Sequence, residues 1–433
     1  MTASLDVVQI CQDLIRIDTS NYGDEPGPGE REAAEYVAAF LSDLELEPVI
    51  RESEPGRASV TCRWEGSDSS RDALVVHGHL DVVPAFAQDW TVDPFGAEII
   101  DGMLYGRGAV DMKNMDAMIL ASVAAMIRAG EKPPRDIVLA FFADEEHGGA
   151  RGAKWMVENH ADDFRGATEA VSEVGGFSVY VGGKRAYLIQ TAEKGIQWLK
   201  LIASGKQGHG SLVHRDNAVA HLAGALSRIG SHTWPVELTP TAERLLQGVA
   251  ELEGIEYEPT PECIDRLVAG LGAMAPMIEA SVRNTSNPTM MDAGYKTNVV
   301  PDSAVGYVDT RYLHGQQEQV LRQIEELAGT HVKVEPYIEE RSLEVPFEGA
   351  LVDKMIAALG VEDPDAPVLP YSLMGGTDNK HLASIGITGY GFAPLQLPPD
   401  LDFPSLFHGI DERIPVDSLH FGTRVLTAFL RDC

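Results

Sequence analysis

Apolar runs that alternate with helical segments constrain the fold of this chain more than any other feature. The runs at 73–76 and 136–142 are rich in large and β-branched apolar residues, which is typical of strands buried on both faces. Segments with apolar residues at helical spacing surround them, at 5–17, 30–44, 106–129 and 150–160. This alternation predicts an α/β fold with a mostly parallel sheet covered by helices.

The pattern changes near residue 190 and changes back near residue 341. Between these positions the sequence predicts further strands and helices, at 196–203, 217–229, 304–312, 317–327 and 331–338. Residues 236–295, with several prolines and glycines, predict an irregular helical stretch. We therefore expect a discontinuous larger domain, residues 1–190 and 342–433, with an α+β domain, residues 191–341, inserted into it.

The charge of the chain narrows the choice of partners. With 34 basic and 66 acidic residues, the formal net charge is −32, so nucleic acid and anionic membranes would be repelled. No apolar run reaches membrane-spanning length, and residues 1–6 lack the profile of a signal peptide. The four cysteines are scattered without metal-type or redox spacing. These features favour a cytoplasmic protein without a nucleic-acid or membrane partner.

His79 and Asp81 follow the apolar run at 73–76 directly, within the segment HGHLDVVP at 77–84. On an extended chain their side chains point to the same side. Open α/β sheets place their sites at the carboxyl ends of strands, and an imidazole that binds a metal usually gives its second N–H to an acceptor. An ordinary surface histidine beside an aspartate fits the same pattern, so this pair alone leaves both interpretations open.

Other acidic and histidine residues stand at expected strand ends or turns, namely Asp111, Glu145, Glu146, Glu173, His209 and His408. Taken singly, each has an ordinary explanation. Asp111 fits a helix N-cap, and the adjacent Glu145 and Glu146 fit a solvated turn. Two neighbouring carboxylates repel each other, however, unless a cation lies between them or one is protonated.

In order and spacing, these segments resemble the M20 family of metallopeptidases and amidohydrolases, which includes glutamate carboxypeptidase, succinyl-diaminopimelate desuccinylase, dipeptidases and aminoacylases. The resemblance covers nearly the whole chain. It rests on HGHLDVVP at 77–84, GRGAVDMK at 106–113, ADEEHGG at 143–149, GHGS at 208–211, NVVP at 298–301 and HGIDE at 408–412. Each motif is weak alone, and their shared order makes the match specific.

The resemblance implies a catalytic domain that binds two metal ions. The nitrogen and oxygen ligands suit zinc, with cobalt or manganese as alternatives. The implied ligands are His79 and Glu173 for one ion, Glu146 and His408 for the other, and Asp111 as the bridge between them.

The resemblance also implies roles for residues that do not bind metal. Glu145 would be the general base, and Asp81 would hold His79 in the correct tautomer. His209 matches a histidine of the inserted lid domain that helps to stabilise the oxyanion, often in the active site of the partner subunit. That role implies a homodimer formed through the inserted domain.

Substrate recognition is implied for three further residues, Arg311, Asn298 and Gly376. A guanidinium binds a carboxylate with two hydrogen bonds, although Arg311 fits an ordinary ion pair with a neighbouring acid equally well. One departure from the family pattern is that Glu173 is followed by Val174 before the glycine pair 175–176. An insertion of one residue there would move Glu173 away from its expected place.

The resulting prediction is a dinuclear zinc hydrolase that cleaves an amide bond in a small substrate with a free carboxylate, such as a dipeptide or a peptide C-terminus. Hydrolysis of N-acyl amino acids is the alternative, and removal of a carbamoyl group is a third. A non-catalytic binding protein on the same fold would be expected to lack Glu145 or a ligand, and all of them are present. A dinucleotide site at Gly106-x-Gly108 is rejected because the third glycine is missing.

Overall fold

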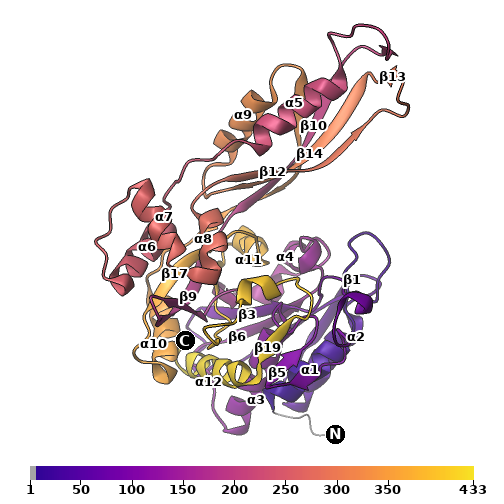
Figure 1. Cartoon of the computed structure of the whole chain (residues 1–433). Coiled ribbons are helices and arrows are strands. Elements are labelled where there is room, and N and C mark those ends of the chain that lie inside the picture. The colour runs from indigo at the N-terminus through magenta and orange to yellow at the C-terminus, as the bar shows by residue number, and fades with distance from the viewer. Residues whose placement is uncertain (1–5) are drawn as a thin grey trace.

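The computed structural model of the chain describes residues 6–433 and divides them into a larger body and an arm that projects from it (Figure 1). Residues 1–5, on which part of the signal-peptide prediction and of the expected helix at 5–17 rests, lie outside the described residues. Among the helices of residues 6–433, none has both the length and the apolar character needed to span a bilayer.

A mixed sheet forms the centre of the larger body. Within the described residues it has ten strands in the order β1-β2-β6-β3-β7-β18-β9-β16, with β17 and β8 also paired to β9. Its strands are β1 (Val49–Glu54), β2 (Arg57–Trp64), β3 (Ala73–His79), β6 (Ile137–Phe142), β7 (Ala167–Ser172), β8 (Phe177–Val181), β9 (Lys184–Glu193), β16 (Leu343–Glu344), β17 (Val368–Leu373) and β18 (Thr388–Gly391). The central pairs β6–β3, β3–β7 and β7–β18 are parallel, whereas β1, β2, β8 and β16 pair antiparallel. The α/β class is confirmed, and the expected parallel arrangement occupies the centre of the sheet.

Helices cover both faces of this sheet because its central strands are apolar on both sides. In β3, Leu74 and Val76 belong to one apolar cluster, and Ala73 and Val75 belong to another. The first face carries α1 (Val7–Arg16), α2 (Arg31–Asp43), α3 (Lys113–Arg128), α10 (Ala350–Glu362) and α12 (Val416–Asp432). The second face carries α4 (Ala153–Asn159) and α11 (Asn379–Leu382). Alternation of side chains along each strand therefore fills two cores at once.

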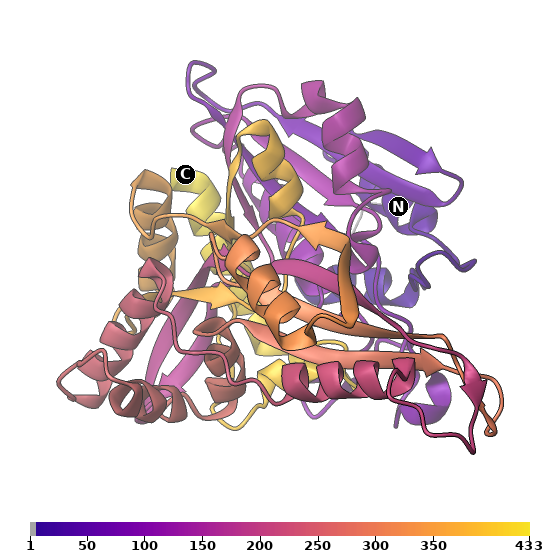
Figure 2. The same cartoon turned by 90° about the horizontal axis from the view of Figure 1, so that it is seen from above.

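The arm is built on a four-stranded antiparallel sheet in the order β12-β14-β10-β15. Its strands are β10 (Gly195–Ser204), β12 (Thr285–Ala293), β14 (Ser303–Tyr312) and β15 (Val332–Glu340). The helices α5 (Ala218–Gly230) and α9 (Gln317–Ala328) pack on one face of this sheet. In Figures 1 and 2 these helices lie on the side away from the larger body, so the other face of the sheet is turned toward that body.

Three helices between the strands of the arm pack elsewhere. They are α6 (Pro240–Glu253), α7 (Pro261–Ala269) and α8 (Ala275–Ser281). Apolar residues such as Leu245 of α6 and Ile278 of α8 share a cluster with Leu369 of β17, so these helices extend the core of the larger body. The predicted range 191–341 therefore spans the arm together with helices that belong to the larger body.

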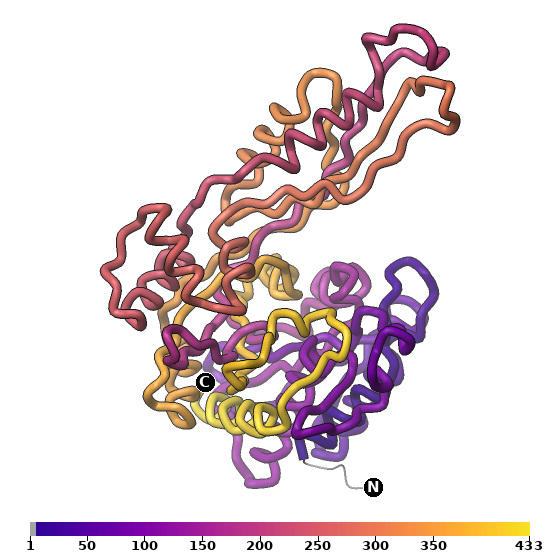
Figure 3. The backbone as a smooth tube through the Cα atoms, viewed as in Figure 1, coloured from indigo at the N-terminus to yellow at the C-terminus, as the bar shows by residue number. Residues whose placement is uncertain are grey.

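The base of the arm is held by buried polar contacts. Lys194 stands alone between β9 and β10, where the chain passes from the larger body into the arm (Figure 3). Its ammonium donates hydrogen bonds to the carbonyl oxygens of Ala280 at 3.0 Å and Arg283 at 2.7 Å. Where the chain returns, Glu340 at the end of β15 forms an ion pair with Lys380 of α11. These contacts fasten both crossings to the larger body.

Candidate metal centre and active site

Three neighbouring strands end at the same edge of the large sheet and bring the predicted ligands together. In the order β6-β3-β7 the strands are parallel, so their carboxyl ends meet. His79 is the last residue of β3, Glu146 lies in the turn after β6, and Glu173 directly follows β7. Asp111 precedes α3, and His408 lies in the loop before β19 (Arg413–Pro415).

The two oxygens of Asp111 face different histidines. Oδ1 lies 3.0 Å from Nε2 of His79, and Oδ2 lies 3.3 Å from Nε2 of His408. Glu173 Oε2 lies 3.5 Å from the first imidazole, and Glu146 Oε2 lies 3.0 Å from the second. The five predicted ligands thus form two groups of three that share Asp111.

Burial and mutual contact shift the pKa values of the side chains in this cluster. Burial raises the pKa of Glu173 to about 7 and also raises the pKa of Glu146. Burial works to lower the pKa of His79, but the carboxylates of Glu173, Asp111 and Glu145 raise it well above its ordinary value. Buried carboxyl groups at this density are stabilised in their charged form by cations placed among them.

The donor atoms of the cluster fit two divalent cations. In each group, His79-Asp111-Glu173 and Asp111-Glu146-His408, the ligand atoms all lie within 4.8 Å of one another. Each group offers imidazole nitrogen and carboxylate oxygen and no thiolate, a donor set that suits zinc, cobalt or manganese. The shared carboxylate is the arrangement that a pair of ions a few ångströms apart requires.

Glu145 lies beside both groups and belongs to neither. Its side chain is 12 % exposed, and Oε2 lies 3.9 Å from Nε2 of His79. Burial raises the pKa of Glu145 well above its usual value, and the nearby Glu173 carboxylate raises it further. A carboxylate that belongs to neither group and is adjacent to the predicted ligand Glu146 can accept and donate a proton at the centre.

Asp81 contacts the site differently from the prediction. His79 Nδ1 lies 2.9 Å from the backbone carbonyl oxygen of Asp81, whereas the nearest carboxylate oxygen of Asp81 lies 3.6 Å away. The carboxylate instead accepts the backbone N–H groups of Glu145 at 3.0 Å and Glu146 at 3.1 Å. The tautomer of His79 is therefore set by a main-chain carbonyl, and the Asp81 side chain holds the turn that carries the expected general base.

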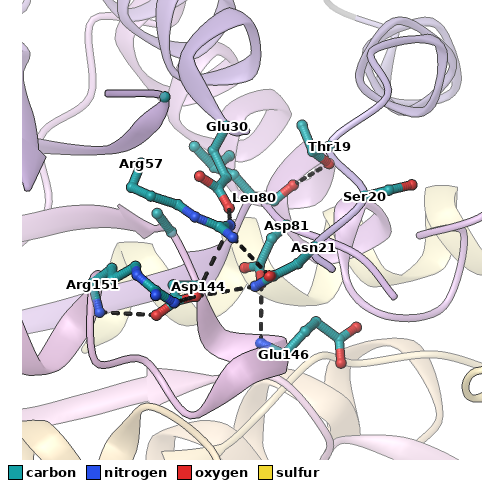
Figure 4. A network of polar contacts seen from close by, with 12 residues as sticks. Thr19, Ser20, Asn21, Glu30, Arg57, Leu80, Asp81, Asp144, Glu146 and Arg151 are labelled. Carbon is teal, nitrogen blue, oxygen red and sulfur yellow. Dashed lines mark hydrogen bonds and ion pairs between the residues drawn. The ribbon is translucent and has the colours of Figure 1, made fainter. Parts of the chain in front are cut away.

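A buried polar network behind Asp81 was not found by the sequence reasoning (Figure 4). The amide nitrogen of Asn21 donates to Asp81 at 2.8 Å and to Asp144 at 3.2 Å. Arg57 donates to the amide oxygen of Asn21 at 2.8 Å and to Glu30 at 2.5 Å. Hydrogen bonds from the segment before α2 therefore help to hold the Glu145–Glu146 turn in place. Its only sequence signal is a polar stretch after the first helix, which reads as an ordinary loop.

A second support that the sequence reasoning missed connects Asp111 with His408. Glu412 Oε1 accepts the backbone N–H groups of Val110 at 2.6 Å and Asp111 at 3.1 Å. Its other oxygen pairs with Arg107 at 2.6 Å, and Arg107 also donates to the backbone carbonyl of His408 at 3.3 Å. Arg107 and Glu412 lie inside two motifs of the family resemblance, GRGAVDMK and HGIDE, but the sequence pattern indicates no role for either residue.

The extra residue after Glu173 is accommodated in the backbone. Val174 adopts a left-handed conformation with φ of 53°, which is rare for a β-branched residue. The Tyr371 hydroxyl donates to the carbonyl oxygen of Val174 and fixes this turn. Glu173 consequently lies beside His79 despite the departure from the family pattern. The peptide bond between Asp111 and Met112 is cis.

The remaining predicted residues fall in three separate places. His209, in β11 (Gly208–His209), and Asn298, just before β13 (Val299–Val300), lie together at the far end of the arm, where β11 and β13 pair. Arg311 lies on the face of β14 turned toward the larger body, where Asp309 pairs with it at 2.7 Å. Gly376 lies in the larger body beside Glu193 and Lys380. Within residues 6–433, the hydrogen bonds of His209 that involve a side chain reach Ser211 and His214 and none of the five predicted ligands.

Comparisons with known proteins agree on one family. Residues 75–432 match Peptidase family M20/M25/M40. The chain is 28 % identical to the N-fatty-acyl-amino acid synthase/hydrolase PM20D1 of Xenopus tropicalis, over 95 % of this chain and 83 % of that protein. It is 27 % identical to the probable carboxypeptidase S-like 1 of Dictyostelium discoideum, over 88 % of this chain and 78 % of that protein.

Among solved structures, the fold is similar to the M20 family metallo-carboxypeptidase Sso-CP2 from Sulfolobus solfataricus. The TM-score is 0.76, with 18 % identity over 99 % of both chains. A similarity over the full length of both chains means that the larger body and the arm are both parts of the shared fold.

Proposed function

The chain belongs to peptidase family M20 and is a hydrolytic enzyme, and from this premise we propose that it cleaves an amide bond whose leaving group is an amino acid with a free carboxylate. The observation that carries the proposal is the pair of three-residue groups that share Asp111, with the half-buried Glu145 beside them and a member of neither group. A dipeptide or a peptide C-terminus is the first substrate class, as predicted from the sequence.

The residues of the centre support hydrolysis by an activated water. Two zinc ions held by the five ligands would polarise the scissile carbonyl and lower the pKa of the attacking water. Glu145 takes a proton from that water as the new carbon–oxygen bond forms, and gives it to the amine nitrogen as the carbon–nitrogen bond breaks. The products are a carboxylic acid and a free amino acid. Asp81 and Asn21 keep Glu145 in place through the hydrogen bonds to its turn.

N-acyl amino acids are a second substrate class that one observation favours. Phe86 and Ile410 are 53 % and 60 % exposed, and they lie on the loops that follow β3 and precede β19, which also hold Asp81 and His408. The two loops are joined by the hydrogen bond from the Thr91 backbone N–H to Asp411 at 2.8 Å. Exposed apolar side chains on these two loops suit an apolar acyl group, and one relative is by name an N-fatty-acyl-amino acid synthase/hydrolase.

The substrate carboxylate requires a partner, for which Arg311, Asn298 and Gly376 stay our candidates. Arg311 would have to exchange Asp309 for the substrate, which an ion pair on an open sheet face permits at little cost. We retain the expected homodimer through the arm and the expected cytoplasmic location. The four unpaired cysteines are consistent with a reducing compartment.

Metal content measured together with hydrolysis of a substrate panel tests the proposal. The panel contains dipeptides, short-chain and long-chain N-acyl amino acids, and the same compounds with the carboxylate blocked as an amide. We expect about two zinc ions at the centre, chelator-sensitive release of amino acids, and loss of activity when the carboxylate is blocked. Equal cleavage of blocked and free substrates would contradict the proposed leaving group.

Glu145→Gln separates general-base catalysis from metal binding. We expect turnover to fall by about 10²–10⁴-fold, because the amide cannot accept the proton, while the metal content stays unchanged. Glu326→Gln, an exposed substitution on α9, is the control and should leave both quantities as in the wild type. Full turnover in the Glu145 variant would remove this residue from the mechanism.

A further inference from the structure

A second group of metal-ligating side chains lies in the arm, apart from the centre described above. Asp216 precedes α5, His221 lies in the first turns of α5, and His331 directly precedes β15. The nitrogen and oxygen atoms of these three residues that can act as ligands all lie within 4.8 Å of one another. No part of the proposed reaction uses these residues.

The side chains of the group are already in mutual contact. The imidazole rings of His221 and His331 are stacked, with centroids 4.2 Å apart and planes 6° from parallel. His221 Nε2 lies 3.2 Å from Oδ1 of Asp216. The stack and the ion pair place two imidazoles and one carboxylate side by side, and nitrogen and oxygen are ligand atoms that zinc accepts.

The backbone beneath each residue is fixed. The carbonyl oxygen of Asp216 accepts the backbone N–H of Lys206 at 3.0 Å. The next residue, Asn217, caps α5 by accepting the N–H of Val219 at 3.0 Å. After His331, Val332 pairs with Ala203 in the sheet. Two segments that are distant in sequence, the start of α5 and the start of β15, are thus held side by side, and the side chains need only rotate to reach an ion.

The charge around the group suits a cation. Within residues 6–433, no ion pair joins Asp216 to a lysine or arginine, and His221 is its partner. A zinc ion bound by tetrahedral ligands about 2.0–2.1 Å away needs ligand atoms about 3.4 Å apart. The side chains of Asp216 and His331 are exposed and can close the remaining distance by rotation.

We propose that Asp216, His221 and His331 bind one zinc ion, with the fourth position open to water. The ion would join the start of α5 to the start of β15 and so stiffen the helical side of the arm. This site goes beyond the proposed function and does not depend on it.

Zinc titration of the zinc-loaded enzyme, followed by calorimetry and by metal analysis after dialysis, tests the site. We expect the wild type to bind one zinc more per chain than His331→Ala, and the thermal midpoint of the wild type to rise on addition of zinc. Asp216→Asn should weaken binding at least tenfold, because the charged ligand is lost. Turnover should be the same in all three proteins, because none of these residues contacts the reaction centre.

A matched control is His420→Ala, which removes an exposed histidine from α12. It should bind zinc as the wild type does. Equal zinc uptake by the wild type and His331→Ala, up to about 100 µM free zinc, would overturn the proposal. This holds whether both proteins bind two or three zinc ions per chain. The test compares the zinc uptake of wild type and His331→Ala, both folded and active. Its result therefore does not depend on whether the proposed substrate class is correct.

Discussion

Two histidines near the end of strand β3 show how strongly the neighbours of a side chain determine its pKa. His77 and His79 in β3 are both 1 % exposed, and they point to the same side of the strand. His79 lies among carboxylates, which raise its pKa well above the ordinary value despite burial. His77 lies against Phe142 and Asn379, and burial lowers its pKa to about 4. Burial is the same for both residues, so the neighbouring charges decide the difference.

The lowered pKa of His77 predicts a loss of stability in acid. An exposed histidine titrates near 6.5, so as the pH falls the unfolded chain takes up this proton before the folded chain does. The contribution of His77 is fully present above about pH 6.5 and is lost as the pH falls toward about 4. The expected slope is up to about 1.4 kcal/mol per pH unit. Urea unfolding at several values between pH 4.5 and 7.5 measures it.

His77→Gln should have a shallower dependence of unfolding free energy on pH. The glutamine amide can still donate to Asn379 and does not titrate. Among residues 6–433, His77 Nδ1 has no hydrogen-bond partner, so a proton added there would find no acceptor. His420→Gln, at an exposed site, should keep the slope of the wild type. An unchanged slope in the His77 variant would show that other groups carry the acid sensitivity.

At the scale of residues, the sequence pattern indicates the candidate ligands better than the residues that support them. His79, Glu146 and Glu173 are placed by strand ends, which apolar runs reveal directly. The supports act through hydrogen bonds between residues far apart, such as Asn21 with Asp81 and Glu412 with Val110. Such partners depend on loop conformation, which no local pattern contains. The role of the Asp81 carboxylate was misassigned for the same reason.

At the scale of elements, two loops share one buried ion pair. Arg107 precedes α3, and Glu412 precedes β19, so their pairing at 2.6 Å holds the segments that carry Asp111 and His408 at a fixed separation. The side chains are 4 % and 0 % exposed, and Arg107 also lies over the ring of Trp90. A separation set in this way would determine whether two ions fit on either side of Asp111.

Glu412→Gln should weaken metal binding and stability together. The amide oxygen can still accept the N–H groups of Val110 and Asp111, but Arg107 loses its counter-charge in a buried site. Breaking a buried pair in this way costs about 3–5 kcal/mol, and loss of a group that supports the ligands costs about 10–100-fold in metal affinity. Denaturant unfolding and competition with a metal chelator measure the two effects.

An exposed ion pair provides the control for this change. Arg431 and Glu131 are 49 % and 39 % exposed, so Glu131→Gln should cost at most about 1 kcal/mol and leave metal affinity unchanged. Equal effects from the buried and the exposed pair would mean that Glu412 does not support the centre.

The elements that the sequence missed have identifiable physical causes. β1 and β12 lie at sheet edges and carry many exposed side chains, so neither shows an apolar alternation. β12 also contains Pro288, which is tolerated in an edge strand and argues against a strand when only the sequence is considered. The helices α6–α8 lie in the irregular helical stretch predicted at 236–295, but the packing of α6 and α8 on β17 was not predicted, because it depends on contacts more than 80 residues away along the chain.

At the scale of the whole molecule, His209 lies at the end of the arm, away from the candidate metal centre of its own chain. β11 and β13 lie at the far end of the arm, and the ligands lie at the carboxyl edge of the large sheet (Figure 1). Leu212 and Val213, just after His209, are 65 % and 89 % exposed. Exposed apolar residues at the end of an arm suit contact with another surface. A homodimer would let this end of the arm reach the centre of the partner subunit, as the family resemblance implies.

Mixed dimers can reveal which centre His209 serves. His209→Ala keeps a complete metal centre but lacks the histidine, and Glu145→Gln keeps the histidine but lacks the general base. If His209 acts across the dimer, a mixed dimer contains one complete site, whereas action within one chain leaves none. Coexpression of both chains in equal amounts should restore about a quarter of wild-type turnover, because about half of the dimers are mixed and each has one working site.

Metal content should be that of the wild type throughout, and light scattering establishes the dimer. No recovery, with dimers present and each parent variant impaired, would place His209 in the site of its own chain, and the arm would then have to close onto its own body.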